Sequence, residues 1–160
     1  MSIEDYLIEQ DGKDWSTLIS AWGWFLPFPF TIWLVNRFGD MVIVRDEGAV
    51  LFFDPGAGKL DQVASNRDEF TRLLDDPQKV DLWFMPPLVD HLTQSSMTLR
   101  VGQCYGYKIP PGLGGAYDIS NFEVTDLDVH YTVLGQIFET IKDAPDGTKI
   151  KFRIKNSSSS

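Results

Sequence analysis

Residues 102–121 read GQCYGYKIPPGLGGAYDISN. Five of its twenty residues are glycine, two are proline and three are tyrosine. Glycine adopts backbone torsions that other residues avoid, and proline holds φ at about −65°. This composition is too specific for a plain linker, so we expect an ordered loop whose backbone path is fixed by its glycines and prolines.

Two interpretations of this loop remain open. Pro110 and Pro111 bias the preceding Ile109 toward an extended backbone, so the chain is expected to leave a strand here. Gly114 and Gly115 then allow a tight reversal. In one interpretation the loop is a structural element that folds back and is closed by its tyrosines. In the other it contacts a partner or ligand, since ordered loops on rigid scaffolds often carry recognition.

The length of the chain is sufficient for one substantial core. At 160 residues and 18.1 kDa, we expect residues 1–155 to form a single domain. A hydrophobic fraction of 43% and a charged fraction of 23% argue against intrinsic disorder. Asn156 and four serines end the sequence, and we expect residues 156–160 to be a disordered tail.

The charge of the protein is strongly acidic and unevenly distributed. The formal net charge is −9, and four of the basic residues lie within residues 149–155. Residues 1–148 therefore hold ten basic against twenty-three acidic residues, a balance of −13. Such a surface repels phosphate backbones, so we expect no direct binding to nucleic acid. It would attract a basic partner.

The cysteine content and the apolar segments indicate the compartment. Cys104 is the only cysteine, so no disulfide can form within the chain, which suits a reducing compartment. The amino terminus lacks the basic and apolar regions of a signal peptide. The apolar run over residues 21–35 is short for a membrane helix and contains a glycine and two prolines. We therefore expect a cytoplasmic protein that does not contact a membrane.

The hydrophobic pattern predicts an α+β fold: an antiparallel sheet with helices packed largely on one of its faces. Met41–Val44 and Ala49–Phe53 flank a turn that contains Gly48, and they predict a hairpin. Lys59–Ala64 would extend this hairpin into a meander. The apolar run over residues 30–38 fits a strand or a buried helix. Further strands are predicted before the glycine-rich loop, over residues 122–127, and over residues 148–155, where a turn containing Gly147 comes first.

Helices are predicted where apolar residues recur every three or four positions. The predicted segments are residues 3–9, 15–22, 67–74, 78–85, a helix that ends near residue 93, and residues 130–142. Asp14 is expected to cap the second of these. For the third, two starts remain open: Ser65 with Asp68, or Asn66 with Glu69. For the last, the cap could be Asp126 or Asp128.

Several blocks of the sequence together resemble one family. They are Asp14-Trp15, Asn36-x-Phe38-Gly39-Asp40, Phe53-Asp54-x-Gly56-x-Gly58, the stretch from Gln103 to Tyr117 with Gly106, Pro110, Pro111, Gly114 and Gly115, then Asn121, His130 and Pro145-Asp146-Gly147-Thr148-Lys149. These blocks, which span about residues 10–152, look like the small bacterial domain at the carboxyl end of Tdi-type type VI secretion immunity proteins. The chain has no room for the GAD-related domain that often accompanies it, so it is similar to the short stand-alone form.

The resemblance implies an immunity-type binding protein. Such a protein is not an enzyme; it stays in the cytoplasm and neutralises a toxic effector, often a nuclease, by stoichiometric binding. The acidic surface predicts that this protein partner is basic. The candidate contacts are exposed acidic residues, namely Asp75, Asp76, Asp81, Asp126 and Asp128. For the glycines, prolines and polar residues of the family blocks we expect structural roles.

Signals for an enzyme are weak. Gly56-Ala57-Gly58-Lys59 invites comparison with a phosphate-binding loop, but Phe53 and Leu60 stand where that motif requires Gly and Ser or Thr. His91, His130 and Cys104 could form a nucleophilic group only if the fold brought them together. We therefore expect no catalytic residue, cofactor or metal site. The alternatives are a small-ligand or nucleotide-binding enzyme that uses the glycine-rich loop, and a scaffold protein.

Overall fold

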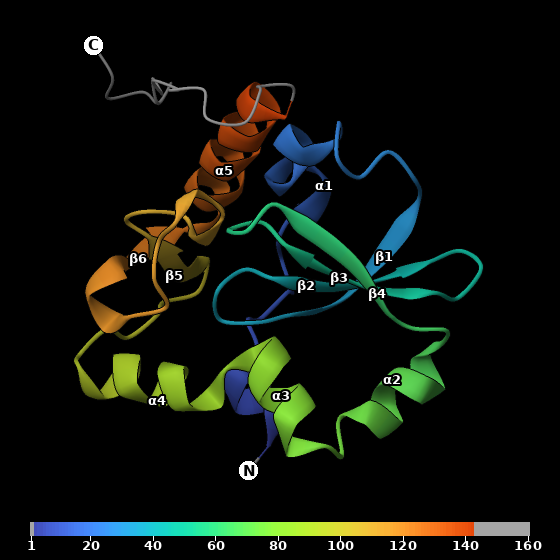
Figure 1. Cartoon of the computed structure of the whole chain (residues 1–160), viewed down its shortest axis with the longest axis horizontal. Coiled ribbons are helices and arrows are strands. Elements are labelled where there is room, and N and C mark those ends of the chain that lie inside the picture. Colours follow the sequence, from blue (N-terminus) through green and yellow to red (C-terminus); the bar gives the residue numbers. More distant parts are fainter. Residues whose placement is uncertain (1, 143–160) are drawn as a thin grey trace.

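The computed structural model describes residues 2–142, and within this range its strands form two antiparallel sheets (Figure 1). The larger sheet has the strand order β1-β2-β3-β4, with β1 at Phe30–Val35, β2 at Met41–Arg45, β3 at Val50–Asp54 and β4 at Lys59–Ala64. The smaller sheet pairs β5 at Gln103–Tyr107 with β6 at Phe122–Asp126. The α+β class and the antiparallel sheet are therefore confirmed.

The predicted meander is present because its turn residues and its runs of apolar β-forming residues both favour paired strands. Gly48 adopts φ 102° between β2 and β3, a torsion that glycine accepts without strain. In the pairing that follows, Ile43 lies opposite Leu51 and Phe53 lies opposite Leu60. The run over residues 30–38, which fitted a strand or a helix, is a strand as far as Val35 and then turns.

Helices lie before, between and after the strands. The α-helices are α1 at Trp15–Leu18, α2 at Arg67–Leu73, α3 at Pro77–Phe84, α4 at Pro86–Gln94 and α5 at Leu127–Ile141, and short 3-10 helices occupy Ile3–Tyr6, Ser20–Trp22, Pro111–Leu113 and Ile119–Asn121. Asp14 caps α1 by accepting from the N–H of Thr17, as predicted. At α2 the structure selects Asn66, whose side chain accepts from the N–H of Glu69 at 2.8 Å. Asp126 is the residue before α5, although its side chain makes no capping bond.

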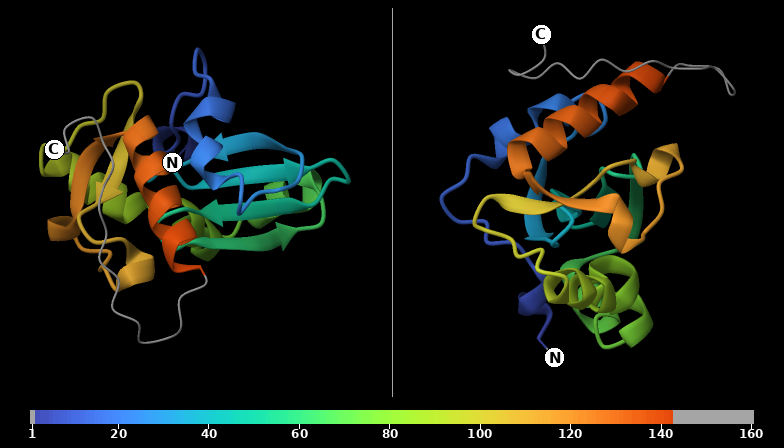
Figure 2. Two further views of the ribbon diagram at one scale, coloured as in Figure 1. Left: turned by 90° about the horizontal axis from the view of Figure 1, so that it is seen from above. Right: turned by 90° about the vertical axis from the view of Figure 1, so that its left-hand side faces the viewer.

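The helices cover both faces of the larger sheet, which corrects the prediction that they pack largely on one face. In Figures 1 and 2 the sheet lies between α1 and α5 on one side and α2, α3 and α4 on the other. The physical reason is visible in β2, where Met41, Val42, Ile43 and Val44 are all buried. Successive strand residues point to opposite faces, so a strand buried along its length needs cover on both.

Two apolar clusters therefore flank the sheet. Val42 and Val44 pack toward α2, α3 and α4, where the cluster includes Phe70, Trp83, Phe84 and Leu92. Met41 and Ile43 pack toward α5, where the cluster includes Trp22, Tyr131, Leu134 and Phe138. Removal of these large side chains from water is the main force that holds the helices on the sheet.

The smaller sheet is joined to the larger one by its backbone. The N–H of Tyr105 in β5 donates to the carbonyl of Arg37 at 2.8 Å, and Arg37 lies in the turn that follows β1. No helix among residues 2–142 is long and apolar enough to cross a membrane. The strand predicted over residues 148–155, the turn containing Gly147 and the serine tail lie outside the described residues.

Candidate functional site

A buried polar cluster brings together family residues from four separate segments: Gly39 and Asp40 before β2, Asp54 at the end of β3, Gly106 in β5 and His130 in α5. Asp40 and His130 are each only 3% exposed. A Cβ atom on Gly39 would lie 3.0 Å from the His130 ring, and one on Gly106 would lie 3.5 Å from His130 Nδ1. The glycines therefore allow two backbone segments to pass close to the imidazole.

The turn that carries Asp40 is held by the side chain of Asn36. Asn36 Nδ2 donates to Asp40 Oδ2 at 3.0 Å and to the carbonyl of Trp83 at 2.8 Å. Asn36 Oδ1 accepts from the backbone N–H groups of Phe38 and Asp40, at 2.9 and 3.0 Å. One buried amide thus organises the turn and ties it to the end of α3.

Burial shifts the pKa values of the ionisable groups in this cluster toward their uncharged forms. Burial raises the pKa of Asp40 well above its usual value, and the neighbouring charge of Asp54 raises it further. Burial also raises the pKa of Asp54. Two neighbouring carboxyls in a poorly solvated site disfavour carrying two negative charges together. Burial lowers the pKa of His130 to about 4, so its imidazole is uncharged at neutral pH.

The thiol of Cys104 does not have the environment of an activated nucleophile. Burial raises the pKa of the Cys104 thiol far above its usual value, so Cys104 has little of the thiolate that nucleophilic chemistry needs. Within the described residues, Asp40 Oδ1, the hydroxyl of Tyr107 and Nε2 of His130 are buried and have no hydrogen-bond partner. No group of three or more metal-ligating side chains is found in residues 2–142.

One member of the polar cluster, Asp54, also helps to support the loop over residues 108–121. Asp54 Oδ1 accepts from the N–H of Ala57 at 3.1 Å and shapes the turn after β3. In that turn the carbonyl of Gly56 accepts from the N–H of Gly112, in the loop, at 3.0 Å. Gly56 also packs on the ring of Tyr107, where a Cβ atom would lie 2.4 Å from Cε2. The loop therefore rests on the same turn that holds Asp54.

Hydrogen bonds between residues of the loop also hold its backbone in place. The side chain of Asn121 bonds the N–H and the carbonyl of Ile109, and also the carbonyl of Ala116. The N–H of Gly115 donates to the carbonyl of Pro110 at 3.1 Å, which closes the reversal after the two prolines. The expectation of an ordered, folded-back loop is confirmed. Not all of the tyrosines close the loop as expected, because the hydroxyl of Tyr105 donates to the carbonyl of Met97 instead.

The ordered loop exposes large apolar side chains. Ile109 is 55% exposed, Leu113 37% and Tyr117 48%. The Tyr117 ring packs edge-on against Tyr107, with ring centroids 6.2 Å apart. We name residues 108–121 the recognition loop, after the role that is proposed for it below. The exposed Ile109 and Leu113 were missed in the sequence, although an apolar residue inside a glycine-proline loop, outside any periodic pattern, is a usable signal.

The five acidic residues predicted to contact a partner are exposed but lie in two groups. Asp75 and Asp76 lie between α2 and α3 and Asp81 lies within α3, whereas Asp126 and Asp128 lie at the start of α5. Asp76 has a structural role, since its side chain accepts from the N–H of Gln78 at 2.9 Å and caps α3. Asp75 and Asp81 line a groove of about 610 Å³, and Asp128 lines a separate hollow of about 340 Å³. The structure therefore does not gather them into one surface.

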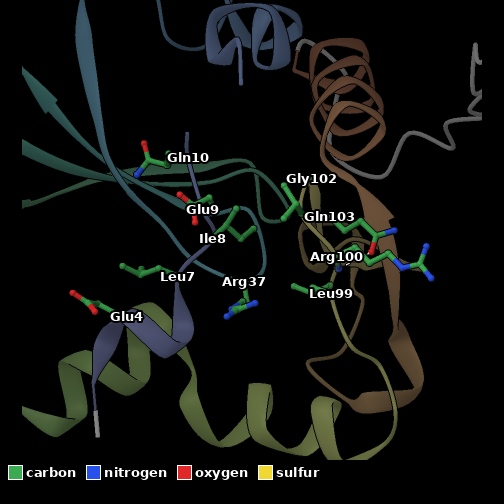
Figure 3. A pocket seen from close by; sticks show the side chains of 11 residues that line it. Glu4, Leu7, Ile8, Glu9, Gln10, Arg37, Leu99, Arg100, Gly102 and Gln103 are labelled. Carbon is green, nitrogen blue, oxygen red and sulfur yellow. Dashed lines mark hydrogen bonds between the residues drawn. The ribbon is translucent and has the colours of Figure 1, made fainter. Parts of the chain in front are cut away.

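A polar hollow of about 450 Å³ lies between the amino-terminal segment and the chain before β5 (Figure 3). Arg37 lines it and also lines an adjoining hollow of about 460 Å³. In Figure 3 the side chains of Glu4 and Arg100 point in opposite directions away from Arg37. The charged groups do not converge on one point, and neither His91, His130 nor Cys104 lines this hollow.

A family model described as "T6SS immunity protein Tdi1, C-terminal" matches residues 64–138. This stretch runs from the end of β4 through α2, α3, α4, the recognition loop and β6 into α5. The match confirms the resemblance over these residues, while the family blocks before residue 64 lie outside it. No curated protein matches the chain.

Proposed function

From the match of residues 64–138 to the carboxyl-terminal domain of Tdi1-type type VI secretion immunity proteins, we propose that this chain is an immunity-type binding protein. It neutralises a toxic effector by stoichiometric binding and spares the cell that produces both. The match carries the proposal, and it includes every residue of the recognition loop.

The recognition loop supplies a plausible physical basis for binding. Because its backbone is already held by Asn121, Gly56 and its own turn, little conformational freedom is lost when a partner docks. Tyr117 gives a large amphipathic contact, and Ile109 and Leu113 give apolar contacts beside it. Exposed aromatic and apolar side chains on a rigid element are the residues from which binding hot spots are built.

The charge of the protein supports a basic partner. The formal net charge is −9, and a surface of this sign raises the association rate of positively charged proteins. We propose that the effector is a nuclease, because a nuclease presents a basic cleft to its own substrate. The same charge disfavours a direct contact of this chain with nucleic acid.

A catalytic role is not favoured by the chemistry of the interior. The imidazole of His130 is buried and neutral at neutral pH, and the Cys104 thiol is held in its protonated form. The exposed titratable side chains of residues 108–121 are those of Lys108, Tyr117 and Asp118, and the Asp118 carboxylate accepts from the N–H of Ser120. This stretch contains neither a histidine nor a cysteine.

The test is co-expression with the product of any toxin-like gene that lies beside the gene for this chain. We expect restored growth and a complex of one copy of each chain, measured by size-exclusion chromatography with light scattering. The double variant Ile109→Asp, Leu113→Asp should weaken this complex at least tenfold. Val101→Asp is the matched control, since Val101 is 81% exposed and lies outside the loop. Absence of both rescue and a complex at micromolar concentration would refute the proposal.

A further inference from the structure

A second surface, far from the recognition loop in sequence, has the properties of a preformed binding groove. It has a volume of about 610 Å³ and lies where the amino-terminal 3-10 helix meets α2, α3 and α4. Its apolar walls are formed by Ile3, Leu74, Pro77, Val80, Pro86 and Pro87. We name it the helical groove; Figure 1 shows these elements together beneath the sheet.

The walls of the helical groove are held rigidly. Pro77 and Pro86 are the first residues of α3 and α4, where proline fixes the backbone in the helical region. Met85 between them has φ 48°, in the left-handed region that residues other than glycine rarely adopt. The side chain of Trp83 in α3 is buried, and the carbonyl of Trp83 accepts from Asn36 Nδ2. The groove is therefore present before any partner arrives.

The rim of the groove is acidic. Asp75 and Asp81 line it and are exposed, and within residues 2–142 neither forms an ion pair. Residues 67–94, which form α2, α3 and α4, hold six acidic against three basic residues. The apolar walls of the groove lie beside two exposed carboxylates. This combination complements a segment that carries an apolar side chain next to lysine or arginine.

We propose that the helical groove binds a segment of the protein partner in which a leucine, isoleucine, methionine or phenylalanine is flanked by lysine or arginine. The apolar side chain enters between Val80 and Pro86, and the basic side chains face Asp75 and Asp81. This inference rests on the proposed function, because the partner is the effector. It adds a second contact surface to the recognition loop and assigns the partner's chemistry there.

The test compares two charge reversals of equal size. The first is Asp75→Lys with Asp81→Lys at the groove. The matched control is Asp46→Lys with Asp61→Lys, two exposed positions at the β2–β3 turn and on β4. The probe is the purified effector, titrated by calorimetry at low and at high salt. We expect the groove variant to lose about tenfold or more in affinity and most of its salt dependence, while the control loses much less.

A third variant tests the apolar walls of the groove. Val80→Gln should lower the affinity, whereas Leu82→Gln on the same helix, at a position 63% exposed, should not. Urea unfolding of each variant separates a loss of binding from a loss of folding. Equal affinity of the groove and control variants for an effector that binds the wild type would overturn this inference alone. A wild type that does not bind the effector would overturn the proposed function and this inference with it. A concentration-dependent dimer that Val80→Gln abolishes would assign the groove to a second copy and also overturn it.

Discussion

The side-chain amide of Asn121 bonds both backbone groups of Ile109: Oδ1 accepts from the N–H at 2.9 Å, and Nδ2 donates to the carbonyl at 2.8 Å. Nδ2 also donates to the carbonyl of Ala116 at 2.9 Å. The β5–β6 ladder ends one residue before Lys108, and the next residue after Ile109 is a proline without an N–H. The amide of Asn121 therefore replaces the strand pairing that the backbone cannot continue.

The first prediction follows from this contact. Asn121→Ala should lower the free energy of unfolding by about 1–2 kcal/mol, because three hydrogen bonds at a partly exposed position are exchanged for bonds to water. Hydrogen exchange at the amides of Ile109 and Gly115 should accelerate. Gln62→Ala, at an exposed position of β4, is the control. Unchanged exchange at both amides would show that Asn121 does not hold the loop.

The second prediction compares two adjacent glycines. A Cβ atom on Gly115 would lie 1.8 Å from the carbonyl oxygen of Ile109, so Gly115→Ala cannot keep the loop in place. Gly114 has φ 95° and open space around it, so Gly114→Ala should cost only about 1–2 kcal/mol of backbone strain. Urea unfolding and effector binding should both be affected more by the first substitution. Equal effects would contradict the loop geometry.

The third prediction concerns acid. The pKa of His130 is lowered by burial to about 4, so between this value and 6.5 the unfolded chain binds more protons than the folded protein. Stability should therefore fall as the pH falls from 6.5 to 4, and His130 should account for about 3 kcal/mol of that loss. In His130→Gln this part of the loss should disappear. Urea unfolding at several pH values measures it, and parallel curves for both proteins would refute it.

The fourth prediction is that Asp40, in contrast to His130, lowers the stability of the protein as the pH rises. The pKa of Asp40 is raised by burial and by Asp54, so the folded protein holds a proton that the unfolded chain releases above its usual pKa. The stability from this protonated form is present at low pH and is lost as the pH rises through the folded pKa. Asp40→Asn should therefore gain stability relative to the wild type as the pH rises. Asp61→Asn, at an exposed position, controls for net charge. A difference between Asp40→Asn and the wild type that does not change with pH would contradict this.

The fifth prediction compares two buried tyrosines. The Tyr131 hydroxyl donates to the carbonyl of Gly39 at 2.7 Å, so Tyr131→Phe leaves a buried acceptor without its bond and should cost about 1–3 kcal/mol. The buried Tyr107 hydroxyl has no partner among the described residues. Tyr107→Phe should therefore be close to neutral or slightly stabilising. Chemical denaturation of both variants checks the order, and a larger loss from Tyr107→Phe would reverse it.

Much of the fold was predictable because its signals are local. The meander of β2, β3 and β4 follows from apolar β-formers on either side of Gly48 and of the turn after Asp54. The caps at Asp14 and Asn66 depend on residues within one turn of the helix start. The ordered recognition loop follows from the torsions that its glycines and prolines permit.

The arrangement of the helices was not predictable from the same signals. The continuous burial of β2 requires cover on two faces, yet periodicity in a helix reports only that it has an apolar side. Which sheet face receives α5 and which receives α3 depends on contacts between residues far apart in the chain. The prediction of one covered face was wrong for this reason.

The candidate site, like the fold, was predictable only in part. The acidic residues were correctly predicted to be exposed, but only the fold separates Asp75 and Asp81 at the helical groove from Asp126 and Asp128 at α5. The sequence by itself determined the strands of the meander, the cap at Asp14 and the folded-back loop, because each depends on torsions and hydrogen bonds between near neighbours. Only the tertiary structure decided that Asp40 and His130 are buried and that Asp40 lies beside Asp54, because burial and the pKa changes it causes depend on packing between distant segments.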